Sequence, residues 1–128
     1  MQRLLLRHLL AATLLVSAVA HGNDTSKAHE ACMQQAFRTL DIVTCISSEY
    51  ERQDKRLNQS YQLLRGQLSS GRRDQLLAAQ RAWITYKEAN CSFYADPEGG
   101  TIARINANAC VLNETIKRAN ELENLMRP

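Results

Sequence analysis

Apolar residues recur at helical spacing along a first long stretch of the chain, from Asp41 to the Ser69-Ser70-Gly71 segment. The intervals between successive apolar positions are four, seven, four, three and four residues, at Ile46, Tyr50, Leu57, Tyr61, Leu64 and Leu68. This spacing places the side chains on one face of a helix and therefore predicts a helix that packs against a core. Asp41 is suited to cap its start, and the Ser-Ser-Gly segment is suited to end it.

Two more stretches have the same rhythm. The first has apolar positions at Leu76, Ala79, Trp83, Tyr86 and Phe93. It stops at Asp96-Pro97-Glu98-Gly99-Gly100, the strongest break in the chain, because proline and glycine both interrupt a helix. The second continues nearly to the C-terminus, with apolar positions at Ile102, Ile105, Ala109, Leu112, Ile116, Ala119, Leu122 and Met126.

A shorter helix is predicted over residues 27–38, before the three long ones. No stretch alternates apolar and polar residues for long enough to indicate a strand. Short connections between helices favour antiparallel neighbours. The pattern therefore predicts an all-α fold, a small antiparallel bundle of about four helices.

The first twenty residues have the character of an export signal. Arg3 and Arg7 precede an apolar run over residues 9–16, and Ala18-Val19-Ala20 is a site that signal peptidase can cut. The run is too short to span a bilayer, which needs roughly 20 residues, and no cysteine follows directly for lipid attachment. A buried N-terminal helix is the alternative interpretation. We expect a signal peptide over residues 1–20 and one periplasmic or secreted domain over residues 21–128.

Four cysteines remain in the expected mature chain: Cys32, Cys45, Cys91 and Cys110. An even number of cysteines in an exported chain favours two disulfides, which would pin the small bundle. Zinc binding is the alternative, but the gaps of 13, 46 and 19 residues contain no CxxC pair, and no histidine lies near the last three cysteines. We therefore expect disulfides and no metal site.

The spacing of the cysteines requires the chain to reverse between partners. Residues 13 apart on a straight helix would lie about 20 Å apart, whereas a disulfide needs Cα atoms within about 7 Å. Local pairing, Cys32–Cys45 with Cys91–Cys110, fits a turn near residues 38–41 and the break after residue 95. The two pairings that cross between these halves stay open at this point.

Under local pairing, Cys91 and Cys110 would not lie at the same height along their two helices. On helices that end near Tyr94 and begin at Thr101, Cys91 and Cys110 would be roughly 8 Å out of step along the axes. We therefore expect the last helix to begin later, near Asn106, or residues 95–105 to fold back over the bundle. A loop folded in this way is a natural binding element.

Charge and motifs exclude several classes of function. Residues 21–128 contain 14 basic and 13 acidic residues, a net charge of 14 − 13 = +1, and no concentrated basic face, so we expect no nucleic-acid partner. The histidines, His8, His21 and His29, come at or before the start of the predicted fold and leave no base for Ser-His-Asp or Cys-His catalysis. No phosphate-binding or dinucleotide-binding motif occurs. We expect no catalytic residue and no cofactor.

Two carboxylates are enough for glycoside hydrolysis, and Asp54 and Glu88 lie within predicted helices. Both stand beside cations in the sequence: Lys55, Arg56 and Lys87. Solvated or ion-paired helix faces are therefore the favoured interpretation. A hydrolase would need both carboxylates to open into one cleft.

A polar stripe accompanies the apolar seam of the first long helix. Asp54, Asn58 and Tyr61 follow one another at positions i, i+4 and i+7. Because Asp and Asn compete for backbone groups within helices, we expect these side chains to bond partners on another helix. Thr115 and Arg118 are the expected partners, in an interhelical polar network that fixes the register of the helices. Trp83, the only tryptophan, is expected to anchor the core.

Four separated motifs occur in order along residues 30–126. They are Cys45…Glu49…Asp54-x-x-Leu57-Asn58-x-x-Tyr61-x-x-Leu64, then Gln80-x-x-Trp83-x-x-Tyr86-Lys87-x-x-x-Cys91, then Gly100-Thr101, then Cys110-x-x-x-x-Thr115-x-x-Arg118-x-x-x-Leu122. This combination resembles the LprI-like lysozyme-inhibitor family, small exported bacterial proteins with four cysteines. Two positions depart from the family pattern. Lys87-Glu88 stands where the family usually has Arg-Asp, and threonine follows Gly100 where serine is usual.

The resemblance implies a periplasmic or secreted binding protein that inhibits lysozyme by occluding its active site. Because the host or competitor lysozymes that such proteins inhibit are basic, docking would use a local acidic surface. We expect this surface on the loop formed by Asp96, Glu98, Gly99, Gly100 and Thr101. The alternative is an envelope interaction or stress module that binds another bacterial partner without inhibiting lysozyme.

Overall fold

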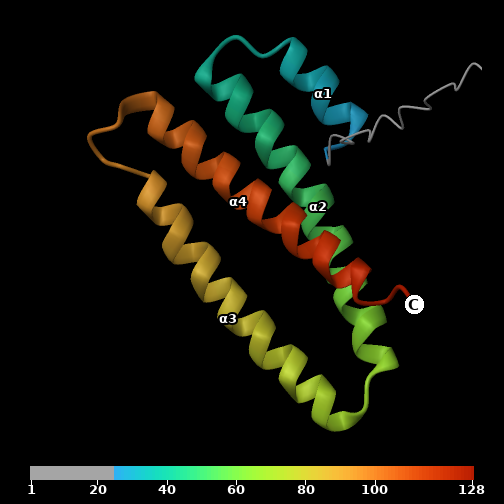
Figure 1. The fold of residues 1–128 in the computed structure, drawn as a ribbon. Coiled ribbons are helices and arrows are strands. Elements are labelled where there is room, and N and C mark those ends of the chain that lie inside the picture. The colour runs from blue at the N-terminus through green and yellow to red at the C-terminus, as the bar shows by residue number, and fades with distance from the viewer. Residues whose placement is uncertain (1–24) are drawn as a thin grey trace, which may run out of the picture.

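Four helices and no strand make up residues 25–128, the part of the chain that the computed structural model describes (Figure 1). The helices are α1 (Lys27–Gln34), α2 (Thr39–Gln67), α3 (Ser70–Tyr94) and α4 (Gly100–Asn124). The predicted all-α fold is confirmed. The expected signal peptide, residues 1–20, lies outside the described residues. Among the four helices, none is long and apolar enough to cross a membrane.

Local hydrogen bonds explain where the helices begin. Ser26 caps α1, because its side chain accepts a hydrogen bond from the backbone N–H of His29 (3.2 Å). Asp41 was expected to cap the first long helix; the N-cap residue is Arg38 instead, and Asp41 contributes to the cap from inside the helix. It is the third residue of α2, where its carboxylate accepts a hydrogen bond from the backbone N–H of Arg38 (3.2 Å).

The connection between the first two long helices is shorter than predicted. Ser70 and Gly71 were expected to lie in the break after the first long helix, but both belong to the first turn of α3. Only Leu68 and Ser69 separate α2 from α3. The chain therefore reverses direction within two residues.

Helix α4 lies between α2 and α3, and α1 packs on α2 (Figure 1). Consecutive helices are antiparallel, as the short connections predict. Because two reversals separate α2 from α4, these two helices run parallel, and α4 makes most of its contacts with α2. The central contact of the bundle is thus one between parallel helices.

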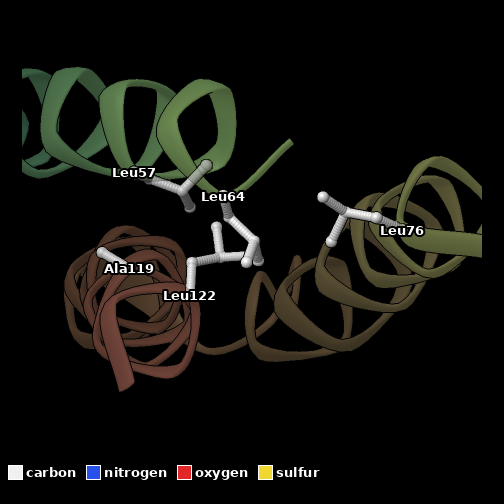
Figure 2. Close-up of a cluster of buried hydrophobic side chains, with 5 residues drawn as sticks. All are labelled: Leu57, Leu64, Leu76, Ala119 and Leu122. Atoms are coloured by element: carbon white, nitrogen blue, oxygen red, sulfur yellow. The ribbon is translucent and has the colours of Figure 1, made fainter. Parts of the chain in front are cut away.

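The core consists of two clusters of buried apolar side chains. The larger one joins all three long helices (Figure 2) and contains Leu57, Leu64, Leu76, Ala119 and Leu122. Tyr61 and Trp83 pack around it while remaining partly exposed. The smaller cluster joins the N-terminal part of α2 to the middle of α4 and contains Ile46, Leu112 and Ile116.

Two disulfides tie neighbouring helices together. Cys32 of α1 is bonded to Cys45 of α2, with a Cα–Cα distance of 5.7 Å, and Cys91 of α3 to Cys110 of α4, at 5.4 Å. The structure thus has the local pairing. All four cysteines are used in this way, which leaves no thiolate for the alternative of a zinc site.

The mismatch between Cys91 and Cys110 is resolved by a stagger of α3 against α4. Neither a late start of the last helix nor a fold-back of residues 95–105 occurs, because α4 begins at Gly100. Cys110 lies about 15 Å into α4, whereas Cys91 lies about 5 Å before the end of α3. The connecting residues 95–99 continue past the end of α3, so the first turns of α4 extend beyond it (Figure 1).

Candidate functional site

The connection over residues 95–99, called here the α3–α4 loop, forms a turn with internal hydrogen bonds. The Asp96 carboxylate accepts from the backbone N–H of Glu98 (2.9 Å), and the Asp96 carbonyl accepts from the N–H of Gly99 (3.0 Å). The Cys91–Cys110 disulfide holds the helices on both sides. The turn is therefore held by its own hydrogen bonds between two helices that a disulfide joins.

A different structural constraint requires glycine at each position of the Gly99-Gly100 pair. Gly100 has a φ of 64°, in the left-handed region that favours glycine. A Cβ atom on Gly99 would lie 2.6 Å from the Cβ of Ala103, which is closer than two carbon atoms can approach. The pair thus sets the path of the chain from the loop into α4.

The predicted binding loop is exposed at one end of the bundle. Asp96, Glu98, Gly100 and Thr101 are exposed, and Gly99 is half-buried. Residues 88–103 contain three carboxylates and no basic residue, although the expected mature chain is slightly positive. This end of α3 and α4 therefore presents a local negative charge.

The predicted network of Asp54, Asn58, Tyr61, Thr115 and Arg118 does not form. Asn58 donates to Asp54 within α2 (3.1 Å), and Thr115 donates to the carbonyl of Val111 within α4 (2.8 Å). Tyr61 packs against the larger apolar cluster. Asn58 follows Leu57, which packs against α4, by one residue, or about 100° around the helix. The Asp54–Asn58 pair therefore points away from α4.

Arg118 does bond between helices, but its partner lies on α3 and not on α2 as expected. Its Nε donates to the side-chain oxygen of Gln80 on α3 (2.9 Å). Its Nη1 forms an ion pair with Glu121 one turn along α4 (2.7 Å). Both Arg118 and Gln80 are buried, so this contact fixes α3 against α4.

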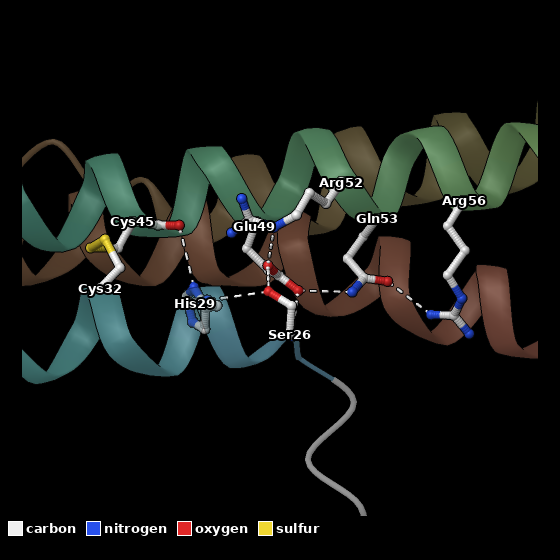
Figure 3. A network of polar contacts seen from close by, with 8 residues as sticks. All are labelled: Ser26, His29, Cys32, Cys45, Glu49, Arg52, Gln53 and Arg56. Carbon is white, nitrogen blue, oxygen red and sulfur yellow. Dashed lines mark hydrogen bonds and ion pairs between the residues drawn. A yellow bond between two sulfur atoms is a disulfide. The ribbon is translucent and has the colours of Figure 1, made fainter.

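The principal polar network centres on Glu49, which is completely buried in α2 (Figure 3). Its carboxylate accepts from the backbone N–H and the hydroxyl of Ser26 at 2.8 and 2.6 Å. It also accepts from the guanidinium of Arg52 (2.7 Å) and the amide of Gln53 (2.8 Å). Burial alone would raise the pKa of Glu49, but these hydrogen bonds outweigh it and lower the pKa to about 2. The carboxylate is therefore charged at neutral pH and ties the start of α1 to α2.

The same network continues along α2 to the end of α4. Arg56 donates to the side-chain oxygen of Gln53 (2.8 Å) and forms an ion pair with Glu123 (2.7 Å). It also bonds Asn120, and Ser60 donates to Glu123 (3.3 Å). The pKa of Glu123 is lowered, chiefly by its hydrogen bond from Arg56. One chain of polar contacts thus connects α1, α2 and α4.

One signal in the sequence could have revealed this network. Glu49, Gln53 and Ser60 lie three, seven and fourteen residues after Ile46, in phase with the apolar seam. A polar residue in such a phase must find a partner in the interior. Asp54 and Asn58 lie beside the apolar seam, whereas the polar residues that form the network lie within it.

The two carboxylates considered for hydrolysis lie in different places. Asp54 borders a surface hollow along α2, and Glu88 borders another between α3 and α4. They do not open into one cleft within the described residues, so the geometric requirement of the hydrolase hypothesis is not met. No group of three His, Cys, Asp or Glu residues between 25 and 128 is arranged to hold a metal ion.

Comparison with known proteins decides the family. The model of the LprI lysozyme inhibitor family matches residues 30–122, which is most of the chain. The protein belongs to the LprI family. It is also 27% identical to "Uncharacterized protein R02472" of Rhizobium meliloti (strain 1021), over 91% of this chain and 92% of that relative. No solved structure matches the chain.

The LprI motif around Trp83 lies at the edge of the core. Trp83 is half-buried against the larger cluster, so it contributes to the core without being enclosed by it. The ammonium of Lys87 lies 4.8 Å from the centre of the Trp83 ring and 6.0 Å from that of Tyr50. Lysine thus occupies the usual arginine position of this LprI motif with a cation–π contact that links α3 to α2.

Proposed function

We propose that this LprI protein is an exported inhibitor of lysozyme that binds the enzyme with the α3–α4 loop and occludes its active site. The match of the family model over residues 30–122 carries this proposal, because it spans nearly all of the described fold. What the family name states is inhibition, and inhibition needs only a binding surface. No reactive group of this chain has to take part.

The two disulfides support action outside the cytoplasm. Disulfides form and persist in oxidising compartments, such as the periplasm and the extracellular space. Each disulfide here joins the two helices that flank a short connection in a small domain. A periplasmic or secreted location, where lysozyme is met, agrees with this chemistry.

The shape and charge of the α3–α4 loop support its role in binding. Its turn is fixed by the Asp96 hydrogen bonds and by the nearby disulfide, so little conformational freedom is lost on docking. Asp96 and Glu98 are exposed and complement a basic enzyme. Such charges mainly raise the association rate and favour the correct orientation.

Charge reversal in the loop is the direct test. We expect the purified, oxidised protein to slow a basic c-type lysozyme at near-equal concentration. We expect the double variant Asp96→Lys/Glu98→Lys to need about tenfold more protein for half inhibition, because electrostatic steering is lost. Inhibition kinetics at low and high salt measure both effects, and the difference between the proteins should shrink at high salt.

A matched control separates the loop from overall charge. Glu51→Lys/Asp74→Lys changes the net charge by the same amount at exposed positions away from the loop. It should inhibit like the unaltered protein. The proposal is contradicted if the unaltered protein fails to slow lysozyme at micromolar excess, or if both double variants are weakened equally.

A further inference from the structure

Both phenylalanines of the chain are almost fully exposed. Phe37 is 87% exposed and Phe93 is 84% exposed. Phenylalanine is among the residues most often buried, and burying its side chain gains on the order of 2 kcal/mol. Because the fold leaves both side chains exposed to water, they are available to pack against the surface of another molecule.

These two side chains have exposed apolar neighbours in the sequence. Leu40, three residues after Phe37, lies in the first turn of α2. Tyr94 is the last residue of α3, and Ile102 lies in the first turn of α4. Within residues 25–128, these five account for half of the ten large apolar side chains that are exposed. The exposed apolar surface is therefore concentrated on two connections and the adjoining turns.

The two connections lie at the same end of the bundle (Figure 1). Residues 35–38, called here the α1–α2 loop, precede α2, and the α3–α4 loop precedes α4. Because α2 and α4 are parallel, their N-terminal parts are neighbours: Ile42 in the first turn of α2 and Ile105 in the second turn of α4 both pack against the smaller apolar cluster. Two loops that are 60 residues apart in the sequence are thus presented together.

Each disulfide fixes one of these loops. Cys32–Cys45 spans the α1–α2 loop, and Cys91–Cys110 spans the α3–α4 loop. The structure places both covalent links on the end that carries the exposed apolar side chains. Surfaces that are fixed in this way bind with a smaller loss of conformational entropy.

The charge of this end indicates the chemistry of the partner. The α3–α4 loop and its flanks, residues 88–103, hold three carboxylates, and the nearest cations in the sequence are Lys87 and the exposed Arg104. In the α1–α2 loop, the charge of Arg38 is paired with that of Asp41 at 2.9 Å. An apolar surface with a negative border complements a basic protein.

We propose that the two loops form one docking surface for lysozyme, with Phe37 and Phe93 as its apolar anchors and Asp96 and Glu98 at its border. This rests on the proposed function and assigns a second loop to it. Large aromatic side chains carry most of the binding energy in protein interfaces, whereas border charges act mainly on association. The two kinds of residue should therefore differ in which rate constant they control.

The experiment measures association and dissociation of the oxidised protein and immobilised c-type lysozyme. We expect Phe37→Ser and Phe93→Ser each to raise Kd at least tenfold, through faster dissociation. Asp96→Lys/Glu98→Lys should instead slow association. Circular dichroism confirms that each variant keeps its helix content, which is expected because the replaced side chains are exposed.

Leucines at the opposite end provide matched controls. Leu63 and Leu125 are 63% and 59% exposed, like Leu40 at 60% and Ile102 at 59%, and they lie near the other ends of α2 and α4. Leu63→Ser and Leu125→Ser should leave Kd within about twofold, whereas Leu40→Ser and Ile102→Ser should raise it.

The outcomes separate this inference from the proposed function. If the unaltered protein binds and inhibits lysozyme but Phe37→Ser binds as tightly, the two-loop surface is wrong while the proposed function stands. If Leu63→Ser weakens binding as much as Leu40→Ser, the docking surface is also wrong. If the unaltered protein neither binds nor inhibits, both proposals fall together.

Discussion

Glu49 combines complete burial with a full negative charge, and hydrogen bonds make this possible. Four donor groups from Ser26, Arg52 and Gln53 replace the water that the carboxylate loses on folding. A buried charge with fewer donors would be neutral or would destabilise the fold. This side chain therefore couples the stability of the protein to pH.

Replacing Glu49 with glutamine should reveal that coupling. The pKa of Glu49 is about 2 in the folded protein against an ordinary 4.5, so the folded state favours the charged form. Its contribution, at most about 3 kcal/mol, is complete above pH 4.5 and is lost as the pH falls toward 2. Urea unfolding should show Glu49→Gln to be less stable at pH 7, with the difference disappearing near pH 2. A constant difference at both pH values would contradict this account.

The sequence predicted the residue types of the interior better than their partners. The apolar positions of the seam are buried as expected, at Leu57, Leu64 and Leu122. The partners of Asp54 and Arg118 were wrong because one residue along a helix rotates a side chain by about 100°. Apolar periodicity predicts which face of a helix points to the core to within about one residue. Predicting a hydrogen-bond partner requires the position of the neighbouring helix as well.

At the scale of the helix, α1 differs from the other three elements. It has eight residues and no fully buried side chain, and a helix of this length is not stable alone in water. Three ties hold it on α2: the Cys32–Cys45 disulfide, the bonds from Ser26 to Glu49, and a hydrogen bond from His29 Nδ1 to the carbonyl of Cys45 (3.2 Å). Its order depends on these ties rather than on its own burial.

Removing the disulfide should release α1 selectively. We expect Cys32→Ala/Cys45→Ala to lose on the order of 3 kcal/mol of stability, as the chain-entropy model gives for a loop of this size. Amide hydrogen exchange should become fast over residues 27–34 and stay slow in the centres of α2 and α4. Unchanged protection of α1 would show that hydrogen bonds alone suffice to hold it.

The elements themselves were predictable, and their stagger was not. Apolar periodicity and the break at residues 96–100 predicted four helices with ends within a few residues of those observed, apart from the end of α1 and the starts of α3 and α4. The cysteine spacing indicated that α3 and α4 could not meet in simple register after Tyr94. It did not give the answer, because a loop that continues past the helix end satisfies the same distance as a loop that folds back.

On the scale of the whole molecule, stability depends on the cluster where the three long helices meet. Leu122 is completely buried there, between Leu57 and Leu64 of α2 and Leu76 of α3. No other cluster in residues 25–128 includes a side chain from α3. The position of α3 therefore depends on this contact, on the Gln80–Arg118 hydrogen bond and on the second disulfide.

A cavity at Leu122 should destabilise the entire bundle. We expect Leu122→Ala to lower the free energy of unfolding by about 2–5 kcal/mol, the range for a fully buried leucine. Leu125→Ala, three residues further on an exposed face, should change it by less than about 0.5 kcal/mol. Urea denaturation followed by circular dichroism compares the two. Similar losses for both variants would place the core elsewhere.

The two disulfides each join cysteines that are consecutive in the sequence. If the chain meets an oxidant from its N-terminus onward, Cys32 and Cys45 become available for pairing before Cys91 and Cys110. When each pair oxidises before the next one emerges, both native bonds form without a wrong pair to exchange. Reshuffling takes seconds to hours, so this order of cysteines lets the protein mature in a compartment that oxidises thiols but rearranges disulfides poorly.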